Sequence, residues 1–327
     1  MTGASGFVGS HILRALLAAQ YRVRALVRPG SRPLPPHDGC TTVEGDVLRS
    51  GDLVQHMEGC RYLVHAAALY SFTPGTHHTI FATNVRGCAG VLEAARLAAI
   101  ERAVVTSSSS TVGPSYGGHP ATEDDRAVED GSSSYHHSKL QQEQVALAAQ
   151  LPVVLVLPTA PIGPGDWKPT PTGKMVVDFM RGRIFATLGG GLNIVAVEDV
   201  ARAHVLALQH GRPRERYLVG GEDISLLQLW ERLAQICGRS APTVRIPIQL
   251  AFTLSWADEF RCRLFSSGAD RMAAPLIPLE GVRMARHHMY ANSAKAQSEL
   301  GYSATSVTAA LERAVRWYRD NGYADDA

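Results

Sequence analysis

The chain has 327 residues, of which 45% are hydrophobic and 19% charged, and its formal net charge is +2. This composition is ordinary for a globular protein with a sizeable core, and the balanced charge, without a basic run, argues against nucleic-acid binding. Five scattered cysteines without a CxxC pair indicate neither a disulfide framework nor a zinc site, so no metal is expected. Since no stretch of about 18 apolar residues occurs, we expect a soluble, cytoplasmic protein without an integral membrane segment.

The chain opens with a glycine-rich segment, Thr2–Ile12, in which three glycines stand at a GxxGxxG spacing before a helical pattern. Glycines let a backbone turn tightly and approach a pyrophosphate, whose charge then lies at the amino terminus of the helix. The alternative is a plain strand-to-helix turn. The residues predicted to contact a dinucleotide here are Gly3, Ser5, Gly6, Phe7, Val8 and Gly9.

A loop of this kind normally follows a buried strand, yet here it begins directly after Met1. We therefore expect the first and most central strand of the sheet to be missing or nearly so. A truncated or misplaced start explains this better than a fold that lacks its central strand.

Short apolar runs then alternate with helical patterns, which predicts βαβ units and a parallel sheet. The runs are continuous and rich in Val or Leu, as expected of strands covered on both faces. A long helix is predicted from about His78 to Ala99. The predicted strands are Tyr21–Arg28, Thr41–Glu44, Tyr62–Ala66, Ala103–Ser107 and Val153–Leu157.

Beyond Pro158 the pattern changes, because Pro and Gly cluster in Pro158–Asp166 and again in Lys168–Gly173, which is typical of irregular loops over a site. Arg216–Gly220 is one more candidate strand, and helical patterns follow Leu226 and end with Val307–Arg319. We expect a Rossmann-type, doubly wound parallel sheet over residues 1–165. Residues 166–327 are expected to form a smaller, mostly helical substrate-binding region, with about 190–220 returning to the first sheet.

The apolar stretch Ile246–Leu264 is interrupted by charged residues. It favours an amphipathic helix packed on its own domain. The alternative is contact with a membrane or with a lipid-like substrate.

The residues after the second predicted strand indicate which dinucleotide is bound. NAD is usually held by an Asp or Glu at this position, and the segment Ala25–Arg32 contains none. Arg28, with Ser31 or Arg32, could instead bind a 2′-phosphate, which favours NADP(H) over NAD(H). The alternative is that Arg28 is a solvated loop charge. Asp46, followed by Val47, is placed to meet the adenine amino group.

Tyr135 and Lys139 stand four residues apart, which places both on one face of a helix. An ammonium about 4 Å from a phenol would favour the phenolate by up to ~4 kcal/mol at an effective dielectric near 20, and so lower its pKa by about three units. The pair therefore predicts an acid–base tyrosine. A hydroxyl that polarises the substrate oxygen should accompany it. Ser108 is the first candidate and Ser109 the second, although strand-end serines often only cap turns.

These motifs together resemble the extended short-chain dehydrogenase/reductase family along almost the whole chain. A narrower likeness is to the hopanoid-associated sugar epimerases, a group similar to dihydroflavonol 4-reductases, and the segments that resemble them are Pro158–Pro164, Lys168–Gly173, Gly191–Asn193 and Gly281–Arg286. The matching segments, in family order, are Thr2–Gly9, Asp46, His65–Ala68, Asn84–Gly87, Thr106–Ser108, Tyr135–Lys139, Pro158, Val197–Ala201 and Leu300–Tyr302.

The resemblance implies that Ser108 orients a substrate carbonyl or hydroxyl, that Tyr135 exchanges its proton, and that Lys139 supports Tyr135 and the nicotinamide ribose. It also implies that Asn84 maintains the geometry of the site. Further residues implied to contact the cofactor are Ala66, Ala67, Ala68, Asn84, Ser107, Pro158 and Ile162.

The resemblance leaves three functions open. Because of Arg28 we expect an NADPH-dependent carbonyl reductase, and the alternative is a sugar (nucleotide) epimerase or dehydratase that retains NAD. A non-catalytic NADP-sensing regulator is the third, although such a protein would be expected to lose Tyr135 or Lys139. A homodimer through helices Thr79–Ala99 and Ser134–Ala149 is also implied. The residues expected to face a small-molecule substrate are Tyr70, Ser109, His136, Thr159, Asp166 and Lys168.

Overall fold

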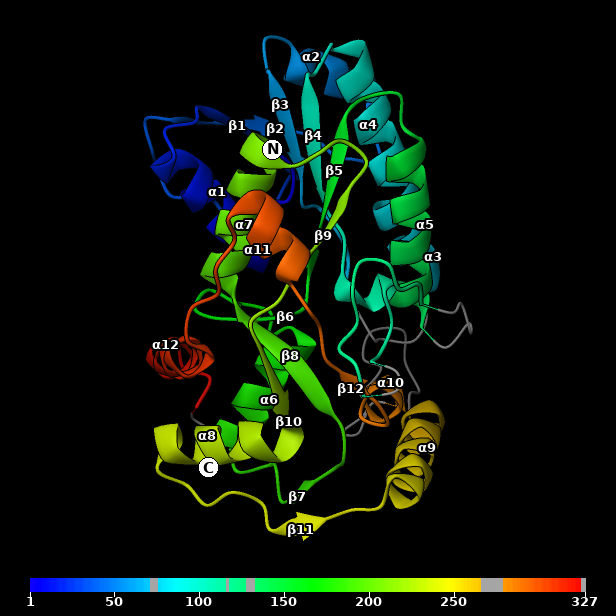
Figure 1. Cartoon of the computed structure of the whole chain (residues 1–327), viewed down its shortest axis with the longest axis vertical. Coiled ribbons are helices and arrows are strands. Elements are labelled where there is room, and N and C mark those ends of the chain that lie inside the picture. The colour runs from blue at the N-terminus through cyan, green and yellow to red at the C-terminus, as the bar shows by residue number, and fades with distance from the viewer. Residues whose placement is uncertain (71–75, 116–117, 128–132, 266–278, 325–327) are drawn as a thin grey trace.

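The computed structural model of the chain describes all residues except 71–75, 116–117, 128–132, 266–278 and 325–327. A sheet of parallel strands occupies one half of the molecule (Figure 1). The expected α/β class with a parallel, Rossmann-type sheet is confirmed. In spatial order the strands are β2 (Cys40–Glu44), β1 (Val23–Val27), β3 (Tyr62–His65), β4 (Arg102–Thr106), β5 (Val153–Pro158) and β9 (Arg216–Val219).

Thr2 joins the two halves of this sheet, because it forms parallel bridges with Leu26 of β1 and with His65 of β3. The Thr2 backbone N–H donates to the Val64 carbonyl oxygen at 3.0 Å. The Leu26 N–H donates to the Met1 carbonyl oxygen at 2.8 Å. Met1 and Thr2 thus lie between β1 and β3 and link the two halves of the sheet.

Helices cover both faces of the sheet because its central strands bury side chains on both sides. Val104 and Val154 belong to the core beneath α1 (Phe7–Ala18) and α7 (Val197–His210). The neighbouring Ala103 and Val153 belong to the opposite core, beneath α2, α4 and α5. The bounds of these and the linked helices are α2 (Leu53–Met57), α3 (His77–Phe81), α4 (Gly87–Leu97), α5 (Ser134–Ala148) and α11 (Ala294–Leu300).

The long helix predicted from His78 to Ala99 is interrupted. A π-helical turn, Ala82–Arg86, lies between α3 and α4. Single π-turns of this kind often mark functional positions, and this one contains the buried Asn84.

A second sheet makes the C-terminal region less helical than expected (Figure 1). Its central strand β8 pairs antiparallel with β10 and parallel with β6 and β12, and a separate pair is formed by β7 and β11. Helices α6, α8 and α12 bury their apolar faces in a third core. The elements are β6 (Ala160–Ile162), α6 (Pro171–Met180), β7 (Ala186–Thr187), β8 (Gly191–Ala196), β10 (Glu222–Ser225), α8 (Leu226–Cys237), β11 (Val244–Arg245), β12 (His288–Met289) and α12 (Val307–Asp320).

The expectation that residues 190–220 return to the first sheet holds for only part of the segment. Arg216–Val219 pairs with β5, whereas Gly191–Ala196 lies in the second sheet. The physical reason is that β8 lies between two cores. Val195 packs in the core of α1 and α7, while Ile194 and Ala196 pack in the third core.

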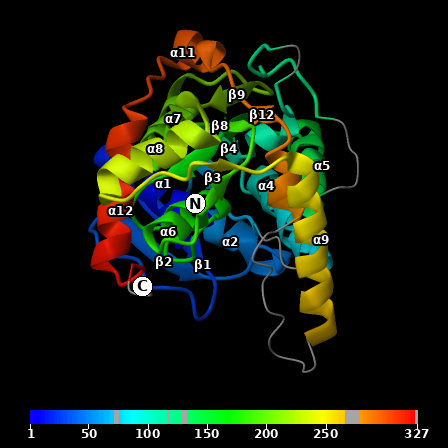
Figure 2. The same ribbon diagram turned by 90° about the horizontal axis from the view of Figure 1, so that it is seen from below.

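The predicted apolar helix is α9 (Ile248–Phe265), which lies at the periphery beside α10 (Leu279–Met284) (Figure 2). Ala251 and Ser255 are buried, whereas Leu250, Leu254 and Trp256 are 50%, 41% and 70% exposed. Over the part of α9 whose side chains are described, the helix therefore packs on its own chain through a narrow stripe. Among the residues that the structure describes, no helix is both long and apolar enough to cross a membrane.

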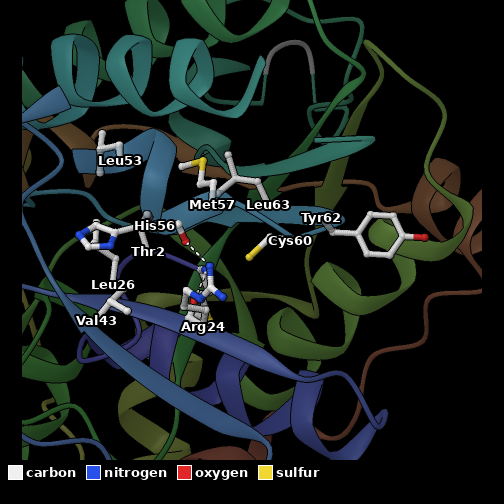
Figure 3. A pocket seen from close by; sticks show the side chains of 11 residues that line it. Thr2, Arg24, Leu26, Val43, Leu53, His56, Met57, Cys60, Tyr62 and Leu63 are labelled. Atoms are coloured by element: carbon white, nitrogen blue, oxygen red, sulfur yellow. Dashed lines mark hydrogen bonds between the residues drawn. The ribbon is translucent and has the colours of Figure 1, made fainter. Parts of the chain in front are cut away.

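A cavity of about 30 Å³ lies between β1 and β3 (Figure 3). Beside it, the Arg24 guanidinium donates through Nη1 to the carbonyl oxygens of His56 and Glu58, each at 2.9 Å. Met1 and Thr2 also line the cavity, so it lies next to the start of the glycine-rich segment.

Candidate active site

The backbone of the glycine-rich loop is packed so closely at Gly3 and Gly9 that neither position has room for a side chain, as expected of a loop that binds a dinucleotide. Gly3 adopts φ +78°, and a Cβ there would lie 2.6 Å from the carbonyl carbon of Ala66 and from the nitrogen of Ala67. A Cβ on Gly9 would lie 1.9 Å from the Gly3 carbonyl oxygen. The Gly6 N–H donates to that same oxygen at 3.0 Å, which closes the turn.

Helix α1 begins at Phe7, and Gly6 provides no side-chain cap for it. The backbone N–H groups of its first turn therefore keep the anion-binding character of a free helix amino terminus. Ser5 is exposed beside it. The predicted loop residues are thus brought together where a pyrophosphate would be held, with Ala66, Ala67 and Ala68 following β3 next to them.

The residues predicted at the adenosine end lie after neighbouring strands. Arg28 is exposed directly after β1, and its carbonyl oxygen accepts from the Ser31 N–H at 3.0 Å. Arg32 is engaged elsewhere, because its guanidinium carbon lies 3.5 Å from the centroid of the Trp167 ring. Asp46 accepts from the Leu48 N–H at 2.9 Å. The buried Val47 side chain packs against Gly87.

The predicted catalytic side chains come from α5 and from the end of β4. Ser133 caps α5, since its side chain accepts from the His136 N–H, and this places Tyr135 in the first turn. Tyr135 is hydrogen-bonded to Ser108, which follows β4. The Lys139 Nζ lies one turn further along, 5.8 Å from the centroid of the Tyr135 ring. The structure thus brings the three predicted residues together.

The predicted effect of Lys139 on Tyr135 is wrong for this structure. Burial raises the pKa of Tyr135 to about 12, and the hydrogen bond with Ser108 opposes this only in part. The Lys139 ammonium donates instead to the Thr106 carbonyl oxygen at 3.0 Å and to Gln142 Oε1 at 2.8 Å. Burial also lowers the pKa of Lys139 to about 8. Desolvation therefore dominates over attraction between the two groups.

Asn84 holds the loop after β3 against α5, as its implied structural role requires. Its Oδ1 accepts from the Leu69 N–H at 2.7 Å. Its Nδ2 donates to the Leu69 carbonyl oxygen at 3.0 Å and to Ser138 Oγ at 2.9 Å.

A buried polar network beneath the site was not predicted from the sequence. Glu143 accepts from Ser107 Oγ at 2.5 Å and from Thr111 Oγ1 at 2.7 Å, and its Oε2 lies 3.1 Å from Arg216 Nε. Burial raises the pKa of Glu143. The Ser107 side chain thus points into this network, so any contact of Ser107 with a cofactor would involve its backbone. The available sequence signal was the position of Glu143, four residues after Lys139 on the same helix.

Three of the predicted substrate residues lie around Tyr135. The Tyr70 ring lies 4.1 Å from the Tyr135 ring, centroid to centroid, and Tyr70 is 38% exposed. His136 follows Tyr135 on α5, and Ser109 follows Ser108; both are half-buried. Tyr70 thus packs against one face of the Tyr135 ring. In this position Tyr70 would also lie beside a bound substrate.

The other three have different surroundings. Thr159 Oγ1 donates to Asn193 Oδ1 at 2.9 Å, and Lys168 is exposed. Asp166 is buried, and its Oδ2 accepts from Thr170 Oγ1 at 2.8 Å and from the Tyr318 hydroxyl at 2.9 Å. The predicted substrate contact of Asp166 is therefore corrected to a structural role, because its carboxylate is used inside the protein.

Pro158 and Ile162 are buried at the ends of β5 and β6, so they would meet a cofactor through their backbones. Within the described parts of the chain, no group of three or more His, Cys, Asp or Glu side chains could hold a metal ion.

A glycine loop at the centre of a parallel sheet, with a hydroxyl, a tyrosine and a lysine grouped at the carboxyl ends of the adjacent strands, defines the class of NAD(P)-dependent short-chain dehydrogenases/reductases. The model of the NAD dependent epimerase/dehydratase family matches residues 1–220, and the chain belongs to this family. It is an NAD(P)-dependent enzyme that acts on a small molecule.

Curated relatives and a solved structure match almost the entire chain. A Synechocystis sp. protein named "Putative dihydroflavonol 4-reductase" is 39% identical, over 99% of this chain and 95% of that protein. Sterol demethylase protein B of Methylococcus capsulatus is 31% identical, over 98% of each. The crystal structure of gox2253 has a TM-score of 0.85 and 34% identity, and the match covers 98% of both chains.

Proposed function

We propose that this enzyme is an NADPH-dependent carbonyl reductase similar to dihydroflavonol 4-reductases. The proposed preference for NADPH rests on the residue that follows β1. An exposed Arg28 occupies this position, at which NAD-binding folds carry an Asp or Glu. The likeness to a protein named as a dihydroflavonol 4-reductase supports the reaction type. The Ser108–Tyr135 hydrogen bond supports a site that handles a carbonyl oxygen.

In the proposed reaction the bound dinucleotide supplies a hydride to the carbonyl carbon of the substrate. Ser108 donates a hydrogen bond to the carbonyl oxygen, and Tyr135 transfers its hydroxyl proton to that oxygen, so that the ketone becomes a secondary alcohol. Lys139 holds a positive charge beside the resulting phenolate, which is then reprotonated from solvent. Tyr70 and His136 would border the substrate, and Tyr70 offers it an aromatic face.

The cofactor preference is tested by fluorescence titration of the purified enzyme with NADPH and with NADH. We expect NADPH to bind at least tenfold more tightly, a difference of about 1.4 kcal/mol. Arg28→Gln should remove most of this preference, because the charge-assisted bond to the 2′-phosphate is lost while NADH binding is unaffected. Arg22→Gln, an exposed arginine just before β1, is the matched control. Equal affinities in the wild type would overturn the assignment.

The second candidate function is a sugar epimerase or dehydratase, which the matching family model favours by its description. Such an enzyme regenerates its nicotinamide and has no need to exchange it. Nucleotide released on denaturation of the freshly purified protein separates the two functions. Stoichiometric NAD, with no response to added NADPH, would support the epimerase or dehydratase; empty protein that reduces ketones with NADPH supports the reductase.

The substrate class is addressed by the same assay. The ketones screened should include a dihydroflavonol and a 3-ketosteroid, because one similar protein is named "Putative dihydroflavonol 4-reductase" and another "Sterol demethylase protein B".

A further inference from the structure

Lys139 and Gln142 form a buried pair on the inner face of α5. Each side chain is 1% exposed. The three-residue spacing places both on the same side of the helix. The Lys139 Nζ donates to Gln142 Oε1 at 2.8 Å and to the Thr106 carbonyl oxygen, at the end of β4, at 3.0 Å.

These two acceptors fix the direction of the ammonium group. A lysine ammonium has three N–H donors and can rotate freely about its last bond. When two donors are held by acceptors on different elements, the third can point in one direction only. Nζ lies 5.8 Å from the centroid of the Tyr135 ring, so the two acceptors hold the ammonium close to the catalytic tyrosine.

We propose that Gln142 is a positioning residue, which anchors the Lys139 ammonium beneath Tyr135 and sets the charge that Lys139 holds during proton transfer. The proposal rests on the proposed function for its chemistry. A neutral amide acceptor suits this task because it directs the ammonium without adding a negative charge to the site. A carboxylate at the same distance would bind the ammonium more strongly and favour its charged form.

Gln142 binds the Lys139 ammonium directly, whereas the titratable groups around Lys139 act on it in other ways. His65 on β3 is buried, and its pKa is lowered to about 3, so it is neutral. The Cys88 thiol on α4 has a pKa raised to about 12 and is neutral as well. Glu143 on α5 raises the pKa of Lys139 through its charge, but its carboxylate is hydrogen-bonded to Ser107 and Thr111 and paired with Arg216. The remaining neighbour on α5 is Tyr135 itself, whose pKa is raised.

The test measures the protonation of Lys139 directly, without turnover. The chain has only four lysines, namely Lys139, Lys168, Lys174 and Lys295. Full-length protein labelled with [13Cε]lysine therefore gives four resonances. The resonance that is lost in Lys139→Arg belongs to Lys139. Gln142→Met removes the acceptor at similar volume, and Gln142→Glu replaces the amide with a carboxylate of the same shape. Gln141→Met, which alters the neighbouring glutamine that contacts His137, is the matched control.

We expect the pKa of Lys139 to fall by at least about one unit in Gln142→Met and to rise by at least about one unit in Gln142→Glu, a tenfold change in protonation in each direction. Gln141→Met should leave it unchanged. Opposite shifts in two folded variants are a signature that a general loss of packing would not produce. Unchanged values, or shifts of the same sign in both variants, would overturn the proposal; circular dichroism establishes that each variant is folded.

A second readout separates this proposal from the proposed function. With NADPH and dihydroquercetin as probe, Gln142→Met should lower kcat at pH 7 about tenfold, with a smaller change in the KM for dihydroquercetin. If the wild type reduces neither this nor any other ketone screened, the reductase function fails. The opposite NMR shifts would still establish the anchoring of Lys139. If the wild type turns over and the kcat of Gln142→Met equals it, the positioning role fails alone.

Discussion

Arg216→Met should destabilise the protein strongly, because Arg216 supports the buried network under the active site. The Arg216 and Glu143 side chains are only 5% and 6% exposed, and their Nε and Oε2 atoms are 3.1 Å apart. Arg216 also donates through Nη1 to the Glu123 carbonyl oxygen at 2.7 Å and through Nη2 to Thr111 Oγ1 at 3.0 Å. Removing one partner of such a pair leaves an uncompensated buried charge, which costs about 3–5 kcal/mol.

Urea unfolding at pH 7, followed by circular dichroism, measures this loss as a change in the free energy of unfolding. The double variant Glu143→Gln with Arg216→Met should recover more than half of it, since the amide carries no charge and can still accept from Ser107. Arg212→Met is the matched control, because the ion pair of Arg212 with Glu299 lies at the surface and should contribute nothing measurable.

The loss should also depend on pH. Burial raises the pKa of Glu143 in the folded protein, and loss of the guanidinium raises it further. A carboxyl whose folded pKa exceeds its unfolded pKa destabilises the fold when it is ionised, and this penalty disappears as the pH falls below the folded pKa. The difference between wild type and Arg216→Met should therefore shrink between pH 7 and pH 5. A loss below about 1 kcal/mol at pH 7, or one that grows on acidification, would refute this account of the network.

Two further variants test the candidate site. Tyr135→Phe should lower kcat for the proposed ketone reduction at least about 100-fold, because the proton donor is lost, while the Kd for NADPH stays within about twofold; Tyr62→Phe, outside the site, is the control. A Tyr135→Phe enzyme with wild-type turnover would remove Tyr135 from the mechanism. Gly9→Ala should abolish dinucleotide binding or folding, because its Cβ would lie 1.9 Å from the Gly3 carbonyl oxygen, whereas Gly189→Ala meets nothing within 4 Å. Retained NADPH affinity in folded Gly9→Ala would show that the loop does not hold the dinucleotide.

The parallel sheet could be predicted from the sequence because its central strands, β4 and β5, are largely continuous apolar runs covered on both faces. Val104 and Val154 face one core and Ala103 and Val153 the other, so no polar alternation obscures the pattern. The second sheet could not be predicted in this way. Its strand β12 has two residues, and β10 begins with Glu222 and Asp223, so neither resembles an isolated strand.

The candidate site was also predicted only in part, because local spacing identifies some of its residues and contacts between distant segments determine the others. Spacing and residue type sufficed for Tyr135 and Lys139, because four residues make one helical turn. They could not show that Arg216 meets Glu143, since the two lie on different elements and only the pairing of β9 with β5 brings them together. Nor could they show burial, which reversed the expected shift in the pKa of Tyr135.

This reversal has a consequence for the direction of the proposed reaction. A tyrosine whose pKa is about 12 keeps its proton throughout the neutral range, and a protonated hydroxyl beside Ser108 is the form that donates to a carbonyl oxygen. The oxidation of an alcohol would require the phenolate, which burial disfavours and which only a charged neighbour could stabilise. Lys139, with a pKa of about 8, still holds most of its charge at pH 7. The same burial that invalidated the prediction from spacing therefore keeps Tyr135 in the protonated form that reduction requires, and it makes the retention of charge on Lys139 the condition for proton release from Tyr135.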